Sequence, residues 1–132
     1  MPIWLEAREV LRFHAELLSE HGGFDEAVDM GAVESTLARP QNVLAYEPES
    51  TIYELGASYG YGFARNHCFS DGNKRVALVC IDVFLLANGY ELEAEEAEAV
   101  SVIRSVAAGK MSEDELSAWV ELRAVVFDSE QA

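Results

Sequence analysis

The sequence predicts an all-α fold, a compact bundle of about six helices. Apolar residues recur at helical spacing along most of the chain, and residues 76–87 are almost wholly apolar. A helix over residues 73–88 would be apolar around nearly its whole circumference, which is typical of a buried central helix. At 132 residues, the chain is expected to form one domain over residues 1–127, with a frayed tail at 128–132.

The first helix is predicted over residues 6–21, where apolar side chains return every three or four positions and Gly22-Gly23 ends the pattern. His14 lies on the apolar face of this helix. A histidine in such a place is more often a core or groove-lining residue than a catalytic one, and we interpret it so.

A second, short helix is predicted over residues 31–38, because Pro40 is expected to stop it. Residues 41–51 have no strong period and are expected to form an exposed loop or flap. A longer third helix is predicted over residues 50–66. Its glycines at positions 56, 60 and 62 weaken it and allow a neighbouring helix to approach closely.

The central helix follows a polar loop, and Asn88-Gly89 is expected to end it with a left-handed turn. Two further helices are predicted over residues 94–108 and 113–127. The acidic run at 91–98 is interpreted as the solvated face of the first of these two helices.

Charge and composition exclude several classes of function. The formal net charge is −15, from 9 basic and 24 acidic residues, so no cation excess exists for broad nucleic-acid binding. The two cysteines lack metal-ligand spacing, and a disulfide framework is not expected. No signal peptide is recognised, and the longest apolar stretch contains Asp82 and is too short to span a bilayer. We expect a cytoplasmic protein with no membrane partner.

One polar loop concentrates the reactive side chains. Residues 67–75 read His-Cys-Phe-Ser-Asp-Gly-Asn-Lys-Arg, directly before the apolar helix. The first turn of a helix offers free backbone N–H groups and the positive end of the helix dipole, which together attract phosphate. The sequence therefore predicts a site for a phosphorylated ligand at this loop.

Each residue of the loop also has a structural explanation. His67 can end the preceding helix, Asp71 can be the N-cap of the next one, and Asn73 is a second choice for that cap. Lys74 and Arg75 are harder to explain, because cations in a first turn oppose the helix dipole at a cost on the order of a few tenths of a kcal/mol each. A bound anion would offset that cost.

Taken together, the side chains match the requirements of phosphoryl transfer to a hydroxyl group. His67, when neutral, can accept a proton from the nucleophile. Asp71 can bind Mg²⁺, which takes one or two carboxylates plus phosphate oxygens and waters. Gly72 lets N–H groups turn toward a phosphate, and residues 73–75 can hold the remaining phosphate oxygens. These are the parts needed to transfer a group from a nucleotide.

The pattern His-x-Phe-x-Asp-Gly-Asn-x-Arg resembles the signature of the Fic/Doc superfamily. With Lys74 at its eighth position, it resembles the Doc (death-on-curing) toxin branch. The resemblance covers most of residues 3–122 and implies the Fic/Doc-type helical fold. Five further segments are similar to that branch: Trp4-Leu5, His21-Gly22-Gly23, Leu37-Ala38-Arg39-Pro40, Ala64-Arg65-Asn66-His67 and Asn88-Gly89-Tyr90.

The resemblance also implies an activity. Doc-type toxins transfer the γ-phosphate of ATP to a threonine of elongation factor Tu, which arrests translation, and a Phd-type antitoxin holds them inactive. Carried over to this sequence, His67 is the base and Asp71 the Mg²⁺ ligand. Four consecutive residues then bind the nucleotide phosphates: Gly72, Asn73, Lys74 and Arg75.

Two alternatives stay open at this point. One alternative is that the chain transfers AMP or another nucleotidyl group to protein hydroxyls. Fic proteins that transfer AMP usually have Gly at the position of Lys74 and a second Arg at the position of Leu78, so both residues disfavour this alternative. The other alternative is a non-catalytic module that binds a nucleotide or a partner protein. The chain also departs from many relatives in having Cys68 in place of Pro and Val76 in place of Thr. It lacks the Ser/Thr-x-x-x-Glu-Gly/Asn pattern of the inhibitory helix, so inhibition in cis is not expected.

Overall fold

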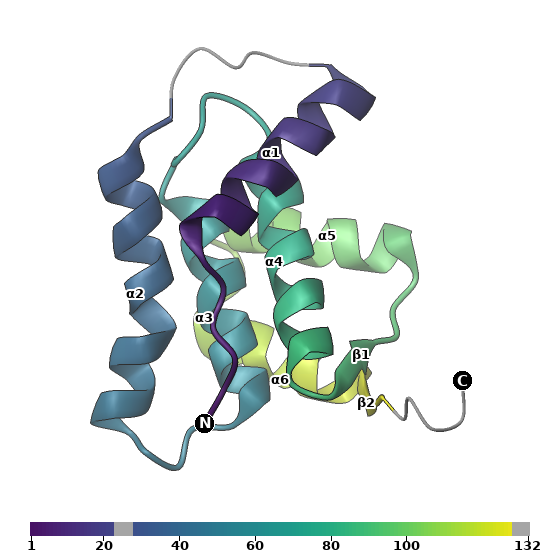
Figure 1. Cartoon of the computed structure of the whole chain (residues 1–132). Helices are drawn as coiled ribbons and strands as arrows, with labels where there is room; N and C mark the ends of the chain where they lie inside the picture. Colours follow the sequence, from purple (N-terminus) through teal and green to yellow (C-terminus); the bar gives the residue numbers. More distant parts are fainter. Residues whose placement is uncertain (23–27, 128–132) are drawn as a thin grey trace.

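The computed structural model describes residues 1–22 and 28–127, and helices make up most of it (Figure 1). The predicted all-α class is confirmed, since six helices pack together and the strands form only a small pair at one end. The predicted tail at 128–132 lies outside the described residues. In chain order the elements are α1 (Ala7–His21), α2 (Met30–Tyr46), α3 (Ile52–Arg65), α4 (Asn73–Ala87), β1 (Tyr90–Leu92), α5 (Glu96–Ala107), α6 (Glu113–Arg123) and β2 (Ala124–Val126).

Helices α3 and α4 share the centre of the bundle (Figure 1). Every residue of α3 from Leu55 to Ala64 except Tyr61 is buried, and this helix packs against α2, α4, α5 and α6. The helix at 73–88 is present as α4, which packs against α1, α3, α5 and β1. Its outer side stays open at Asp82 and Leu86, so the central position is shared with α3.

Glycines in α3 set how closely its neighbours approach. A β-carbon added at Gly60 would lie 2.7 Å from Cγ1 of Ile81 on α4, and one at Gly62 would lie 2.7 Å from Cγ2 of Thr36 on α2. At Gly56 the nearest atom would be 3.6 Å away, which is ordinary van der Waals contact. The predicted close approach is therefore confirmed at two of the three glycines.

Helix α2 is longer than predicted. The expected stop at Pro40 is wrong, because α2 continues through it to Tyr46 and only residues 47–51 form a loop. A proline inside a helix removes one backbone hydrogen bond and costs about 3 kcal/mol. Tertiary contacts around Pro40 outweigh that cost.

These contacts are apolar burial and an ion pair to α6. Pro40 is itself buried, as is Leu37 one turn earlier. The guanidinium of Arg39 donates two hydrogen bonds to the Glu113 carboxylate at the start of α6, at 2.8 and 2.7 Å. Burial and a bidentate ion pair thus hold the helix together where its own backbone is weakest.

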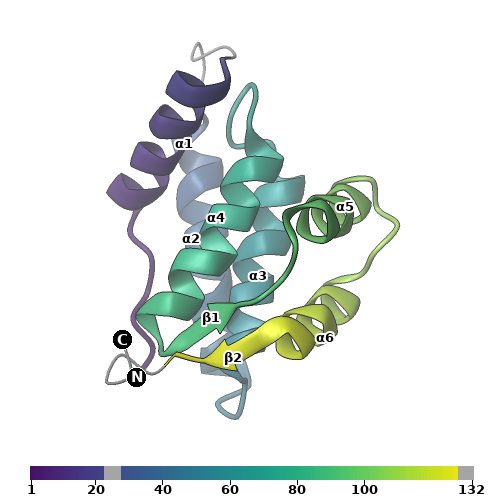
Figure 2. The ribbon, with the colours of Figure 1, turned by 90° about the vertical axis from the view of Figure 1, so that its right-hand side faces the viewer.

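Strands β1 and β2 form an antiparallel pair beside α6 (Figure 2). Tyr90 lies opposite Val126 and Leu92 opposite Ala124. The interpretation of the acidic run at 91–98 as one helix face is wrong for its first part, which lies in β1 and in the loop before α5.

The last predicted helix ends earlier than expected. The prediction of a helix over 113–127 is wrong after Arg123, where the chain turns into β2. The cause is pairing with β1, a segment distant in the chain, which no local pattern reveals.

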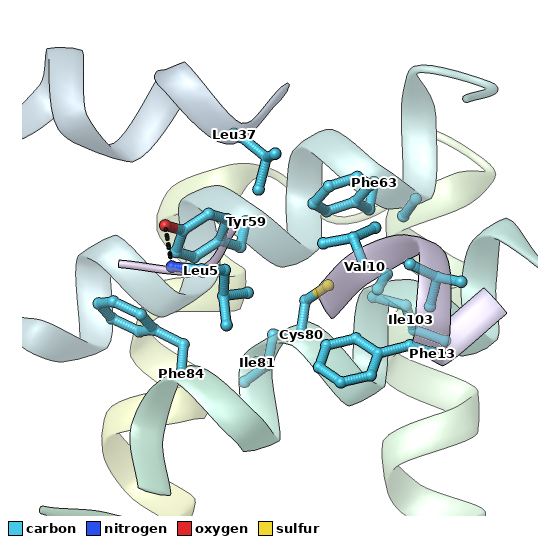
Figure 3. Packing of buried hydrophobic residues seen from close by; sticks show 14 of the residues in the cluster. Leu5, Val10, Phe13, Leu37, Tyr59, Phe63, Cys80, Ile81, Phe84 and Ile103 are labelled. Carbon is cyan, nitrogen blue, oxygen red and sulfur yellow. Dashed lines mark hydrogen bonds between the residues drawn. The ribbon is translucent and has the colours of Figure 1, made fainter. Parts of the chain in front are cut away.

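The residues before α1 are fastened to the core by a buried hydrogen bond. The backbone N–H of Leu5 donates to the hydroxyl oxygen of Tyr59 at 3.1 Å, as Figure 3 shows among the packed apolar side chains. Tyr59 is fully buried, and burial raises the pKa of its hydroxyl to about 12. The ring of Trp4 stacks on Phe84, at 6.0 Å between centroids.

The turn after α4 is hydrogen-bonded to segments near both ends of the described chain. Asn88 bonds the backbone of Ile3 twice, accepting from its N–H at 2.7 Å and donating to its carbonyl at 3.0 Å. Gly89 has the expected left-handed conformation, with φ of 93°, and its carbonyl accepts from the N–H of Phe127 at 2.8 Å. Among the described residues, no helix is long and apolar enough to cross a membrane.

Candidate active site

The loop between α3 and α4 ends in a left-handed glycine. Gly72, with φ of 85°, is the N-cap of α4, and its carbonyl accepts the helix bond from the N–H of Val76 at 3.0 Å. Asp71 is therefore not the N-cap, and its carboxylate instead accepts from the Gly72 N–H at 2.8 Å. Because glycine has no side chain, the N-cap residue itself leaves the first-turn N–H groups uncapped.

The side chain of Asn73 closes the loop on itself. Its oxygen accepts from the backbone N–H of Phe69 at 3.1 Å, and its amide nitrogen donates to the carbonyl of Phe69 at 2.8 Å. Both ends of the amide are thus used within the loop. Phosphate binding by the Asn73 side chain stays a prediction, and the second N–H of its amide nitrogen is the donor that such a bond would use.

A pocket of about 480 Å³ opens at the start of α4. One wall is made by five consecutive loop and helix residues, 71–75, together with Leu78 and Gly22. The other wall comes from α5, with Glu96, Val100, Ile103 and Arg104. Five of the six predicted site residues therefore lie in one wall of the same pocket.

Three cations line this pocket: Lys74 and Arg75 from α4, and Arg104 from α5. Within the part of the chain that the structure describes, none of the three makes a side-chain ion pair, whereas Arg39 and Arg123 are paired with glutamates. The chain has only nine basic residues and a net charge of −15, so one third of its cations line this pocket without an ion-pair partner among the described residues. Such a group favours an anionic ligand.

His67 stands on the same loop but does not line the pocket. It directly follows Asn66, the C-cap of α3, and its side chain is exposed. With φ of 48°, it is the one non-glycine residue of the described chain in the left-handed region. That conformation costs a non-glycine residue on the order of 1–2 kcal/mol, and such strain is often found at functional sites.

The two residues after His67 anchor the loop in the core. Cys68 is buried, and its carbonyl accepts from the N–H of Asp29 at 2.8 Å. Burial raises the pKa of the Cys68 thiol, so the thiol stays protonated and unreactive. Phe69 is buried too and forms an isolated antiparallel bridge with Val28, just before α2.

Two residues lie at the loop that the sequence analysis did not assign to it. Arg104 enters the pocket from α5, and its only signal in the sequence is that it is a cation in an acidic chain. His14 of α1 contacts the loop directly, with its ring stacked on Phe69 at 3.9 Å between centroids. The interpretation of His14 as a buried residue is confirmed, since its side chain is 3 % exposed.

The donor set at the pocket suits a loosely held Mg²⁺ ion. In the described residues no three His, Cys, Asp or Glu side chains gather as a complete protein cage. Asp71 is exposed and uses one carboxylate oxygen for the Gly72 N–H, which leaves its other oxygen free for a cation. Mg²⁺ is usually bound through one or two carboxylates together with substrate phosphates, so the residues fit the predicted role.

Comparison with known proteins places the chain in a family. The model of the Fic/DOC family matches residues 4–85, which include the whole loop. "Protein kinase doc" of Escherichia phage P1 is 32% identical over 108 residues, 82% of this chain and 85% of that protein. "Toxin Doc" of Mycolicibacterium smegmatis is 35% identical over 75 residues, 56% of this chain and 58% of that protein. The chain therefore belongs to the Fic/DOC family.

Proposed function

We propose that this chain is a Doc-like toxin, a protein kinase that transfers the γ-phosphate of ATP to a threonine of another protein. The supporting observation is the pocket at the start of α4, where five consecutive residues of the family motif, Lys74 and Arg75 among them, face the cation Arg104 from α5. None of these three cations has an ion-pair partner among the described residues. The names of the two relatives, a kinase and a toxin, agree with this assignment.

The cations and the helix start would hold the triphosphate. Lys74 and Arg75 can bind its oxygens from α4, and Arg104 can bind them from α5, so the phosphate chain would lie between the two helices. The first-turn N–H groups of α4 add the positive end of the helix dipole. Mg²⁺, held by Asp71, would neutralise charge on the phosphates.

His67 would act as the base from outside the pocket. The acceptor hydroxyl belongs to another protein and must approach the γ-phosphate from solvent, and His67 is exposed on that loop. As the bond from the hydroxyl oxygen to the γ-phosphorus forms, the bond to the β,γ-bridging oxygen breaks and ADP leaves. The hydroxyl proton passes to the neutral His67 ring.

The direct test uses ATP labelled at the α- or the γ-phosphate, with purified elongation factor Tu as the acceptor and Mg²⁺ present. We expect label on the acceptor only from γ-labelled ATP. His67→Ala and Asp71→Asn are expected to lower the rate by about 100-fold or more, because each removes a group that acts in the transition state. Asp82→Asn is the matched control, since Asp82 lies on α4 outside the pocket lining.

The outcomes separate the competing functions. Label transferred only from α-labelled ATP would establish AMP transfer in place of the kinase reaction. Transfer to other proteins but not to elongation factor Tu would keep the kinase and discard the target. If His67→Ala still arrests growth on expression as wild type does, the chain acts by binding rather than by catalysis.

A Phd-type antitoxin and a cytoplasmic location belong to the same proposal. The net charge of −15 suits a partner segment that carries basic residues. Co-expression with such an antitoxin is expected to restore growth, and growth arrest that persists at high antitoxin levels would contradict this partner.

A further inference from the structure

His14 is a buried polar residue whose polar contact goes to the motif loop. It lies on α1, far from the loop in sequence, and its Nε2 atom is 3.0 Å from the carbonyl oxygen of Asp71. Its ring stacks almost flat on Phe69, at 13° between the planes. A β-carbon at Gly72 would lie 3.5 Å from the His14 ring, so the ring also contacts the last residue of the loop.

Packing alone does not account for a histidine at this place. A buried polar group costs free energy unless it is hydrogen-bonded, and an apolar ring would stack on Phe69 equally well. A carbonyl oxygen can only accept, so Nε2 of His14 carries the proton and donates it. The specific contribution of His14 is therefore this one N–H group.

The peptide unit that accepts this bond also controls the Asp71 carboxylate. The carbonyl of Asp71 and the N–H of Gly72 belong to the same planar peptide, and fixing one fixes the direction of the other. That N–H donates to the Asp71 carboxylate at 2.8 Å. A chain of two hydrogen bonds thus runs from His14 through the Asp71–Gly72 peptide to the carboxylate.

We propose that His14 is a positioning residue that orients the Asp71 carboxylate for its cation through the Asp71–Gly72 peptide. The inference rests on the proposed function, which makes Asp71 the Mg²⁺ ligand. Groups that orient a metal ligand in this way are worth about 10- to 100-fold in metal affinity or activity in other proteins. The Nε2–H of His14 would have that effect here, although it touches neither nucleotide nor acceptor.

Four variants separate the N–H group from the ring. His14→Phe keeps a buried ring on Phe69 and removes the donor. His14→Gln loses the ring but carries an N–H at about the reach of Nε2, and His14→Asn is the shorter amide that does not reach it. Phe69→Leu removes the stacking and leaves the donor in place.

The Mg²⁺ dependence of γ-phosphate transfer is the main readout. We expect His14→Phe to raise the Mg²⁺ concentration for half-maximal rate by about 10-fold with little change in melting temperature, and His14→Gln to recover most of the loss. His14→Phe with unchanged Mg²⁺ dependence would overturn the inference. An equal rise in this Mg²⁺ concentration for His14→Gln and His14→Asn would also overturn it. The comparison of these two variants decides the question if His14→Phe does not fold.

A second readout does not depend on activity. Hydrogen exchange at the Gly72 amide is expected to be faster in His14→Phe than in wild type, and close to wild type in His14→Gln. Unchanged exchange in His14→Phe would overturn the inference. If wild type transfers no phosphate but this exchange pattern holds, the proposed function fails while His14 still orients the peptide.

Discussion

The close packing of α3 on α4 predicts that one substitution has opposite effects at two positions of the same helix. Gly56 and Gly60 are both buried in α3, one turn apart. In a helix interior, Gly→Ala is worth up to about 1 kcal/mol of stability from backbone propensity alone. At Gly56 the nearest neighbour would be 3.6 Å from the new β-carbon, so most of this gain should be realised.

At Gly60 the steric cost exceeds the gain. The new β-carbon would meet both Cδ1 and Cγ1 of Ile81, the latter at 2.7 Å. Ile81 is fully buried, so its side chain can shift only against the neighbours that pack on it. Overpacking of this kind costs about 1–3 kcal/mol, and two contacts at a buried residue place it near the upper value. After the propensity gain, Gly60→Ala is expected to destabilise the fold by about 2 kcal/mol.

Urea and thermal unfolding followed by circular dichroism measure both effects. For a chain of this length, 1 kcal/mol corresponds to about 4 °C, so Gly60→Ala should melt about 8 °C lower and Gly56→Ala a few degrees higher than wild type. Ile81→Val removes the Cδ1 atom and should lessen the cost of Gly60→Ala in the double variant by about 1 kcal/mol. Equal stability of the two alanine variants would refute the reasoning.

Two further predictions concern the pocket and the core. Arg104→Ala is expected to weaken Mg²⁺·ATP binding in calorimetric titrations by about 10-fold, because a charge-assisted hydrogen bond is worth about 1.5–3 kcal/mol. Lys110→Ala, which removes a cation from an adjoining pocket and not from the candidate site, should leave the affinity unchanged. Equal losses of affinity in both variants would indicate only a general charge effect. In urea unfolding between pH 8 and 12, wild type should lose stability relative to Tyr59→Phe as the pH rises above 10. The unfolded tyrosine releases its proton near pH 10, whereas burial keeps Tyr59 protonated to about 12 in the fold. By pH 12 the loss in free energy of unfolding, relative to Tyr59→Phe, approaches about 2–3 kcal/mol. A difference between the two proteins that does not change with pH would contradict this prediction.

Local signals in the sequence predict four helices, α1, α3, α4 and α5, to within two residues at each end. Gly22 ends α1 and Asn88-Gly89 ends α4, as predicted. Each signal acts through its immediate neighbours along the chain, so it can be read without knowledge of the packing.

The elements that differ from prediction are those that depend on distant partners. Helix α2 passes through Pro40 because neighbouring helices bury it and Glu113 binds Arg39. Residues 124–126 form a strand because β1 is beside them. In both cases tertiary contacts outweigh local propensity.

The candidate site shows the same division. The residues at 71–75 are consecutive, so the sequence alone brings them together, and the structure places them in one pocket wall. Arg104 and His14 join them only through the packing of α5 and α1, and no spacing in the sequence reports that packing. The two hydrogen bonds between the Asn73 side chain and the Phe69 backbone could not be predicted from the sequence either, since any asparagine beside a loop has several partners within reach.

The turn at Asn88-Gly89 has a practical consequence for work on this protein. It bonds Ile3 and Phe127, so both of these residues lie at the C-terminal end of α4, while the pocket lies at its N-terminal end. The 15 residues of α4 separate the two ends by about 22 Å. A tether or fluorescent label joined near either residue would leave the pocket mouth unobstructed. A short linker between them would allow a circular permutant, with new ends opened at residues 47–51.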